Sequence, residues 1–243
     1  MQYFGGKARI AKPLAEFLNS QLKEGQSFVD LFCGSCNVIS KIDSKRIRIA
    51  NDLHYELIEM WKYASQHTPF SPDRVDEVMY KRMRKDKNNE EFPAWLRGFA
   101  GFGCAFGGDW FKGFAKDNAP NGGQDYFKCA VNSTNKKLSG LTCVEFTNKS
   151  YQDVVLPENS MIYCDIPYSN SVGYSVGKFN HEEFYKWAVQ KQLEGHTVLV
   201  SEYKDNVPEG WEIVWELSSR KSIRDSEGVQ KETVEVLMKP KEK

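Results

Sequence analysis

Residues 27–37 read SFVDLFCGSCN, an apolar, β-rich run that reaches an acidic residue and passes into a turn of small residues. A buried strand followed by such a turn is typical of a parallel sheet, and open sheets of this kind bind ligands at the carboxyl ends of their strands. Gly34 lets the backbone approach a ligand closely, and the Asp30 carboxylate suits a positive or hydroxylated group. Taken alone, the stretch also fits an ordinary turn between a strand and a helix.

Six further runs rich in β-branched and aromatic residues lie at 46–50, 141–147, 160–165, 196–203, 211–217 and 233–239. Amphipathic helical patterns at 11–22, 54–67 and 181–195 alternate with them. This alternation predicts an α/β fold, a Rossmann-like, mostly parallel sheet covered by helices on both faces. The last two runs are joined by a polar segment without a helical pattern, so we expect an antiparallel hairpin at the C-terminal edge of the sheet.

Residues 67–139 break this alternation. Their centre, RGFAGFGCAFGGDWFKGFAKD at 97–117, has no sustained period of 2 or 3.6 residues. Aromatic residues beside glycines and lysines suit stacking on bases and contact with phosphates, but they also suit a structural excursion packed by its own aromatics. We therefore divide the chain into a core of residues 1–66 and 140–243 and an inserted target-recognition segment, residues 67–139.

The overall charge of the chain argues neither for nor against a nucleic-acid partner. Lys and Arg number 33 and balance 33 Asp and Glu, so any electrostatic footprint on nucleic acid must be local. Basic clusters occur at 81–87 and 220–224, although such runs are usually solvated helix faces. For contact with duplex DNA we predict Arg82, Arg84, Lys85, Arg97, Trp110, Lys112 and Lys116.

The cysteines and histidines do not form a metal-binding pattern. Cys33 and Cys36 form a C-x-x-C, but a second pair and histidines at matching spacing are lacking, so we predict no metal site. A redox pair is an alternative, although the neighbouring Gly and Asn suit a ligand loop better. We find no signal peptide, and no apolar run approaches the length of roughly 20 residues that would span a membrane. We expect a cytoplasmic monomer or weak dimer with reduced cysteines, outside any membrane.

The second predicted strand ends in Asn51-Asp52. Asp52 follows Gly34 by 18 residues (52 minus 34), which is close to the roughly 20 residues between the glycine-rich loop of a nucleotide-binding sheet and the acid that binds the ribose. The dinucleotide fingerprint is absent because Cys36 stands at its second glycine position. A cofactor without a pyrophosphate fits better, and S-adenosylmethionine is the candidate. Asp52 would hold its ribose and Lys7 its carboxylate, unless Lys7 is simply solvated.

Residues 162–170, IYCDIPYSN, end the fourth strand, which in a doubly wound sheet lies beside the first. Asp165 offers a fixed acceptor there, Pro167 stiffens the turn, and Tyr168 offers a face for stacking. An exocyclic amine of a base needs this combination, because acceptors orient its lone pair while a ring clamps the base plane.

In order along the chain, YFGGK, FVDLFCGSCNV, the Asn51-Asp52 strand end, DIPY and VSEY resemble the Dam-like, D12 class of DNA adenine-N6 methyltransferases, especially the short forms common in bacteriophages. The resemblance covers most of the chain outside residues 67–139. It implies a class I methyltransferase sheet of seven strands, S-adenosylmethionine as cofactor and the cytoplasm of a bacterial host cell.

The resemblance also implies roles for single residues. The family's D-P-P-Y catalytic motif corresponds to Asp165, Ile166, Pro167 and Tyr168. Isoleucine replaces the first proline there, but it keeps the carbonyl that would hold the target amine and favours an extended backbone. With the residues discussed above, the predicted cofactor-binding set is Tyr3, Phe4, Gly6, Lys7, Asp30, Phe32, Cys33, Gly34, Ser35, Asp52, Ser150, Tyr151 and Asp165.

We therefore predict a site-specific DNA adenine-N6 methyltransferase that acts on an adenine flipped out of the duplex. The replaced proline and the neutral charge leave open a catalytically silent DNA- or protein-binding module with the same fold. Methylation of cytosine N4 or of RNA would use the same geometry and is a further alternative.

Overall fold

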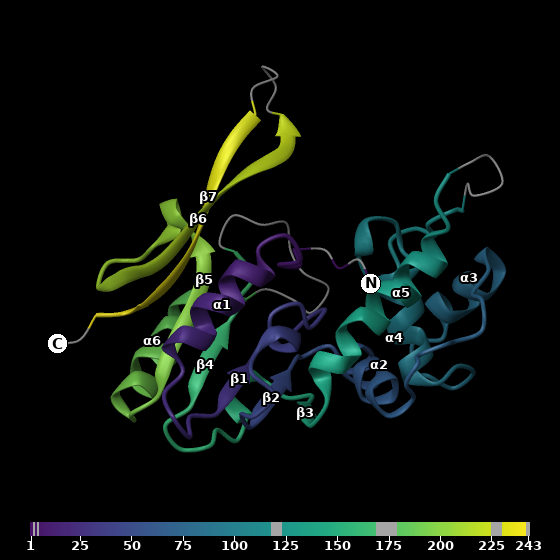
Figure 1. Ribbon diagram of the computed structural model, residues 1–243. Helices are drawn as coiled ribbons and strands as arrows, with labels where there is room; N and C mark the ends of the chain where they lie inside the picture. The colour runs from purple at the N-terminus through teal and green to yellow at the C-terminus, as the bar shows by residue number, and fades with distance from the viewer. Residues whose placement is uncertain (2, 4, 118–122, 169–178, 225–229, 242–243) are drawn as a thin grey trace.

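The computed structural model describes residues 1–241 with the exception of residues 2, 4, 118–122, 169–178 and 225–229. Within these residues, one sheet has the strand order β3-β2-β1-β4-β5-β7-β6 (Figure 1). The strands are β1 (Phe28–Asp30), β2 (Arg48–Asn51), β3 (Val144–Thr147), β4 (Met161–Cys164), β5 (Thr197–Tyr203), β6 (Trp211–Arg224) and β7 (Gln230–Pro240).

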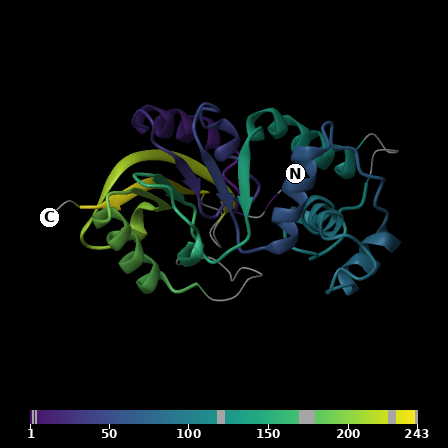
Figure 2. The same ribbon diagram turned by 90° about the horizontal axis from the view of Figure 1, so that it is seen from below.

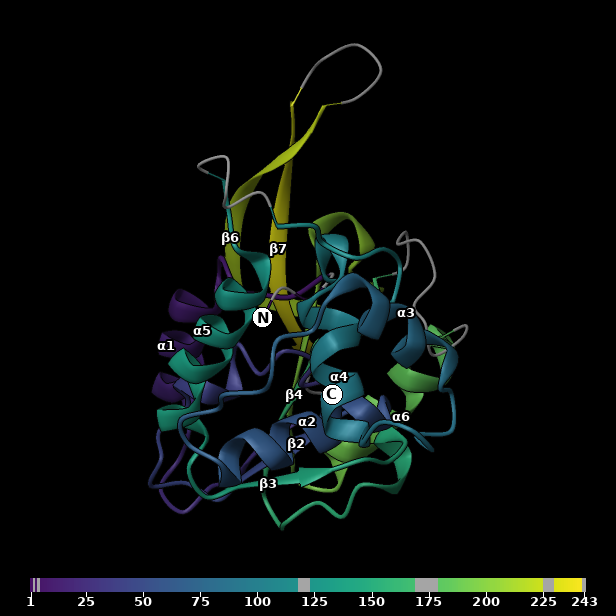
Figure 3. The ribbon, with the colours of Figure 1, turned by 90° about the vertical axis from the view of Figure 1, so that its right-hand side faces the viewer.

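The sheet is parallel from β3 to β5 and antiparallel at one edge. β1 pairs in parallel with β2 and β4, and β7 runs antiparallel to both β5 and β6. This confirms the predicted α/β fold with an antiparallel hairpin at the C-terminal edge. Figures 1 and 3 show that the β6–β7 ribbon projects beyond the other strands at the end where β5 stops.

Helices cover both faces of the sheet, which explains why its central strands are apolar throughout. Phe28 and Tyr163 pack in one buried cluster with Leu14 of α1 (Ala11–Gln21). The alternate residues Val29 and Ile162 pack in a second cluster with α6 (His181–Leu193), and Figure 2 shows these two helices on opposite faces. Side chains of a strand alternate between faces, so β1 and β4 are buried on both sides.

Four helices lie beyond β3 and form a helical body (Figure 1). They are α2 (Tyr55–Gln66), α3 (Glu77–Lys85), α4 (Ala94–Gly103) and α5 (Tyr126–Leu138). The Asn135 side chain of α5 exchanges two hydrogen bonds with the backbone of Phe70, each 2.8 Å long, and so connects the two ends of the predicted insertion. The boundaries of that insertion stay a prediction.

Residues 97–117 show no sustained helical period, but the first seven of them, residues 97–103, belong to the helix α4. All seven of these residues are buried, and the helix ends at Gly103, so its period is too short to be sustained over residues 97–117. Its glycines permit close packing. A Cβ on Gly98 would lie 2.0 Å from the carbonyl oxygen of Glu56 in α2, and one on Gly101 would lie 2.2 Å from the Trp110 ring.

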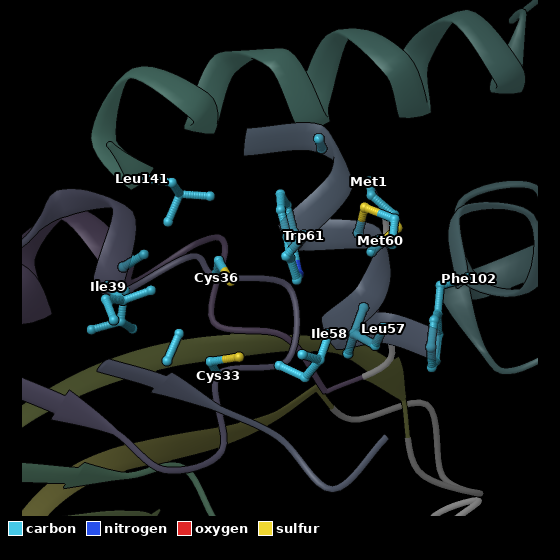
Figure 4. Packing of buried hydrophobic residues seen from close by; sticks show 14 of the residues in the cluster. Met1, Cys33, Cys36, Ile39, Leu57, Ile58, Met60, Trp61, Phe102 and Leu141 are labelled. Atoms are coloured by element: carbon cyan, nitrogen blue, oxygen red, sulfur yellow. The ribbon is translucent and has the colours of Figure 1, made fainter. Parts of the chain in front are cut away.

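The helical body also supports the turn that follows β1. Trp61 of α2 points toward Cys36 in Figure 4, and its indole nitrogen donates a 2.9 Å hydrogen bond to the carbonyl oxygen of Gly34. Lys137 of α5 donates a 2.6 Å hydrogen bond to the carbonyl oxygen of Ser35, and burial lowers the pKa of Lys137 to about 8. Across the described residues, no helix combines the length and apolar character needed to cross a membrane.

Replacing Gly98 with alanine should destabilise the protein by about 3 kcal/mol, because the added methyl group meets α2 backbone that cannot move aside freely. Urea unfolding of Gly98→Ala and of a matched Gly113→Ala variant measures this. A Cβ on Gly113 would meet nothing within 4 Å, so that variant should stay within about 0.5 kcal/mol of the wild type. Equal stability of the two variants would contradict the close α2–α4 packing.

Candidate active site

A pocket opens at the carboxyl ends of β1, β2 and β4. Every predicted cofactor-binding residue that the structure describes lines it, and Phe4 lies outside the described residues. Further lining residues outside the predicted cofactor-binding set are Gly5, Leu31, Asn37, Val38, Asn51, Leu53, Lys149, Tyr163, Pro167 and Phe179. Most of these neighbour predicted residues in the chain, whereas Phe179 follows the D-I-P-Y turn at a distance and carries no sequence signal of its own.

Asp30 ends β1 at the floor of the pocket. Asp30 is 2% exposed, and its Oδ1 has no hydrogen-bond partner in the structure. Burial, followed by the charges of Asp165 and Asp52, raises the pKa of Asp30 well above its usual range. A buried carboxylate oxygen without a donor is costly, so a ligand that brings a positively charged donor would be stabilised here.

The turn after β1 is held in a left-handed conformation. Gly34 has φ of +45°, and its N–H donates a 2.9 Å hydrogen bond to Oδ2 of Asp52. The other oxygen of Asp52 accepts from the N–H of His54 at 2.9 Å. Asp52 therefore connects the ends of β1 and β2 in addition to lining the pocket, and burial raises its pKa.

Cys36 occupies the position where the dinucleotide fingerprint has its second glycine, and its φ of 53° is indeed the one that glycine favours. Cys33 and Cys36 are both buried free thiols. Burial raises the pKa of Cys33 well above its usual range, which disfavours the thiolate that redox chemistry requires. The geometry thus suits a ligand loop better than a redox pair.

Aromatic rings form one wall of the pocket. Tyr151 lies with its ring centroid 6.0 Å from that of Phe32 and 6.1 Å from that of Phe179. Phe184 of α6 packs behind them, 5.3 Å from Tyr151. This wall offers an apolar flank to a flat ring system in the pocket.

The D-I-P-Y turn after β4 brings its acid to Lys7. The Lys7 ammonium is buried, lies 2.6 Å from Oδ1 of Asp165, and stands 4.4 Å above the centroid of the Tyr168 ring. Burial raises the pKa of Asp165, and the charge of Lys7 opposes that rise. The sequence did not predict this pair, and the expected contact of Lys7 with a cofactor carboxylate stays a prediction.

Ile166 and Pro167 shape the turn in different ways. Ile166 is 1% exposed as a whole residue, does not line the pocket, and packs in the buried cluster of α6. The carbonyl oxygen of Pro167 accepts a 2.7 Å hydrogen bond from Nε2 of His181. The isoleucine that replaces the family's proline therefore adds its bulk to the core and leaves the pocket free.

The residues predicted to contact DNA lie in the helical body, and most are exposed. Arg84 and Lys85 are exposed at the end of α3, where Arg82 forms an ion pair with Glu91. Lys112 and Lys116 are exposed in the segment after α4, with ion pairs to Asp109 at 3.0 Å and to Glu77 at 3.3 Å. Trp110 is half-buried, 4.2 Å from the His54 ring. Their contact with DNA stays a prediction.

Arg97 requires a correction. Its side chain is 3% exposed, and its guanidinium donates to the Met83 carbonyl oxygen at 3.0 Å and to Oδ1 of Asn89 at 2.6 Å, and lies 2.7 Å from Oε1 of Glu56. A guanidinium held in this way is not available to a phosphate. Arg97 is an interior ion-pair residue that joins α4 to α2.

Among the described residues, no group of three or more His, Cys, Asp or Glu side chains is placed to hold a metal ion.

The sheet, with its pocket at the turn after β1, has a Rossmann-like, mostly parallel α/β fold with an antiparallel edge. Residues 3–94 match the model of the D12 class N6 adenine-specific DNA methyltransferase family, which confirms the resemblance over that part of the chain. The matched part contains the Gly34 turn and Asp52, whereas the D-I-P-Y turn lies beyond it.

Among solved structures, the chain is similar to SMU.472, a presumed methyltransferase complexed with SAH. The identity is 12% and the TM-score 0.39, over 98% of this chain and 54% of that one, so this chain spans about half the length of its structural neighbour. No curated protein matches the chain in sequence.

Replacing Arg97 with methionine should lower the free energy of unfolding by about 3–5 kcal/mol, because Glu56 would be left largely buried without its partner. Urea unfolding measures the loss. An Arg84→Met variant on the exposed end of α3 should change stability by less than about 0.5 kcal/mol. Wild-type stability of Arg97→Met would contradict the structural role of this arginine.

Proposed function

We propose that this chain is an S-adenosylmethionine-dependent DNA methyltransferase that acts on the N6 amine of adenine. The observation that carries the proposal is the meeting of two groups in one pocket. Asp30 and the Gly34 turn of β1 lie there beside Asp165 of the D-I-P-Y turn. The family match over residues 3–94 supports the first group, and the contacts of Asp165 and Tyr168 support the second.

The residues of the pocket fit the proposed cofactor. The unpartnered Oδ1 of Asp30 would hold the ammonium of its amino-acid part, because that donor supplies both the missing hydrogen bond and a compensating charge. Asp52 would hold the ribose hydroxyls, and Phe32 and Tyr151 would flank the adenine. When bound, S-adenosylmethionine supplies an electrophilic methyl group on a positively charged sulfur.

Asp165 would hold the target amine at the other side of the pocket. With Oδ1 bonded to Lys7, Oδ2 is the acceptor that we assign to one amine N–H. A fixed acceptor on the amine directs the nitrogen lone pair away from itself, toward the cofactor side of the pocket. The pKa of Asp165, raised by burial, suits a carboxylate that receives the proton the amine loses.

Tyr168 would clamp the plane of the target base. Lys7 lies over one face of the Tyr168 ring, and the Tyr203 ring, with its centroid 4.4 Å away, is inclined to it by 69°. A base inside a duplex cannot reach such a clamp, so flipping at a cost of a few kcal/mol is part of the proposal. The substrate is duplex DNA, contacted by the exposed lysines and arginines of α3 and of the segment after α4.

The buried position of Ile166 favours an active enzyme over a silent module, because its side chain stays out of the pocket. Cytosine N4 and RNA adenine present an equivalent amine, and the same clamp fits them. Adenine in DNA is preferred because the family match describes that substrate.

The test is to incubate the protein with duplex DNA and S-adenosylmethionine, digest the DNA to nucleosides and quantify the methylated products. We expect N6-methyladenine from the wild type and at least a 100-fold loss of rate in Asp165→Asn, since a positioned acceptor contributes about 10²–10⁴ in rate. Asp153→Asn, an exposed acid outside the pocket, is the control and should retain activity. N4-methylcytosine would change the assigned substrate, and absence of product with cofactor bound would favour the silent module.

Asp30→Asn should weaken binding of S-adenosylmethionine at least tenfold, because the ammonium loses its charged partner. In the wild type, affinity should rise with pH until Asp30 is ionised, since burial raises the pKa of Asp30 in the free protein. Calorimetric titration at several pH values measures both effects. 5′-Methylthioadenosine lacks the amino-acid end and should bind both proteins equally; equal weakening of both ligands would refute the role of Asp30.

A further inference from the structure

Glu235 lies at the edge of the sheet where the pocket opens. It belongs to β7 and pairs with Tyr203, the last residue of β5, so it stands at the carboxyl end of that parallel strand. Side chains alternate along β7, and Glu235 therefore shares a face with Leu237, which packs in the buried cluster of α1. The chain segment that leads into α1 carries Lys7, so this register turns Glu235 toward Lys7.

The Glu235 carboxylate meets two members of the candidate site. Its Oε2 accepts a 3.2 Å hydrogen bond from the hydroxyl of Tyr168 and lies 3.6 Å from the Lys7 ammonium. The side chain is 18% exposed, so solvent screens these contacts only partly. Lys7 in turn lies 2.6 Å from Asp165, which makes a continuous chain of contacts from β7 to the proposed amine acceptor.

These contacts fix the two groups whose placement matters for transfer. The hydroxyl hydrogen bond holds the far end of the Tyr168 ring, and the nearby Tyr203 ring limits its tilt. Lys7 lies between two carboxylates, so its charge is divided between Asp165 and Glu235 instead of falling on Asp165 alone. Without Glu235, the ring and the ammonium would both lose an anchor on the sheet.

We propose that Glu235 is a positioning residue for methyl transfer, which anchors the Tyr168 hydroxyl and the Lys7 ammonium and so holds the aromatic clamp and Asp165 in their working arrangement. The inference rests on the proposed function, because it assigns the clamp to a target base. Residue 235 lies outside the part of the chain that matches the family model, so the role is read from this structure alone.

The experiment compares Glu235→Ala, Glu235→Gln and the wild type in steady-state methylation of unmethylated duplex DNA. Glu235→Ala should lower kcat about 10–100-fold, since a misplacement of about 1 Å can cost 10²-fold. The glutamine amide oxygen can still accept from Tyr168, so Glu235→Gln should recover part of that loss. The dissociation constant of S-adenosylmethionine should change less than about threefold in both, because Asp30 and the Gly34 turn are untouched.

Glu209→Gln, on an exposed turn before β6, is the matched control and should behave as the wild type. Full kcat in Glu235→Ala, or a loss confined to cofactor affinity, would overturn the proposal. So would equal losses in the alanine and glutamine variants, because an acceptor at this position would then have no role.

A double-mutant cycle keeps the inference separate from the proposed function. If Glu235 acts through Tyr168, the Glu235→Ala/Tyr168→Phe double variant should be no slower than the slower single variant, and its melting temperature should fall by less than the sum of the single shifts. If the wild type forms no methylated nucleoside, the proposed function fails, but the melting temperatures still test whether Glu235 anchors Tyr168. Additive shifts in melting temperature would show that the two residues act independently and would overturn the proposed role of Glu235.

Discussion

The parallel pairing of β1 with β4 is the constraint on which the rest of the site depends. Asp30 stands opposite Tyr163 in this pair, so Asp165 follows two residues beyond that position at the same edge of the sheet. Parallel strands bring their carboxyl ends together, and the two turns that follow them must therefore share one space. The turn after β1 and the D-I-P-Y turn are neighbours for this reason, although more than a hundred residues separate them in the chain.

This arrangement concentrates buried negative charge. Asp30, Asp52 and Asp165 all line the pocket, and burial raises the pKa of each of them. Lys7 compensates Asp165 directly, while backbone N–H groups stabilise Asp52. Oδ1 of Asp30 has no hydrogen-bond partner, so the negative charge of the pocket favours binding of a cationic ligand there.

The helical body contributes hydrogen bonds to the turn after β1, which lines the pocket. Trp61 and Lys137 both donate to carbonyl oxygens of the turn after β1. Trp61 belongs to α2, which precedes the predicted recognition segment, and Lys137 belongs to α5, which lies within it. The shape of that turn is thus connected to the helical body through two hydrogen bonds. The interior ion pair of Arg97 with Glu56 holds α4 against α2 within the same body.

The sheet could be predicted because its central strands are buried on both faces and read as apolar runs, and the turn after β1 because Gly34 and the acids lie at the ends of those runs. The helix α4 could not, since its period ends at Gly103 and does not continue through the residues that follow. Arg97 reads as a surface charge unless its distant partner Glu56 is known. The contacts of Lys7 with Asp165 and of Tyr168 with Glu235 join residues far apart in the chain, and no local pattern encodes them.

The most direct measurement of the central claim is a crystal structure of the protein bound to S-adenosylhomocysteine, the product form of the proposed cofactor. The account predicts density in the pocket, with the amino group within hydrogen-bonding distance of Asp30, the ribose at Asp52 and the sulfur facing Asp165. Density at another place on the molecule, or a ligand whose amino group lies away from Asp30, would contradict it.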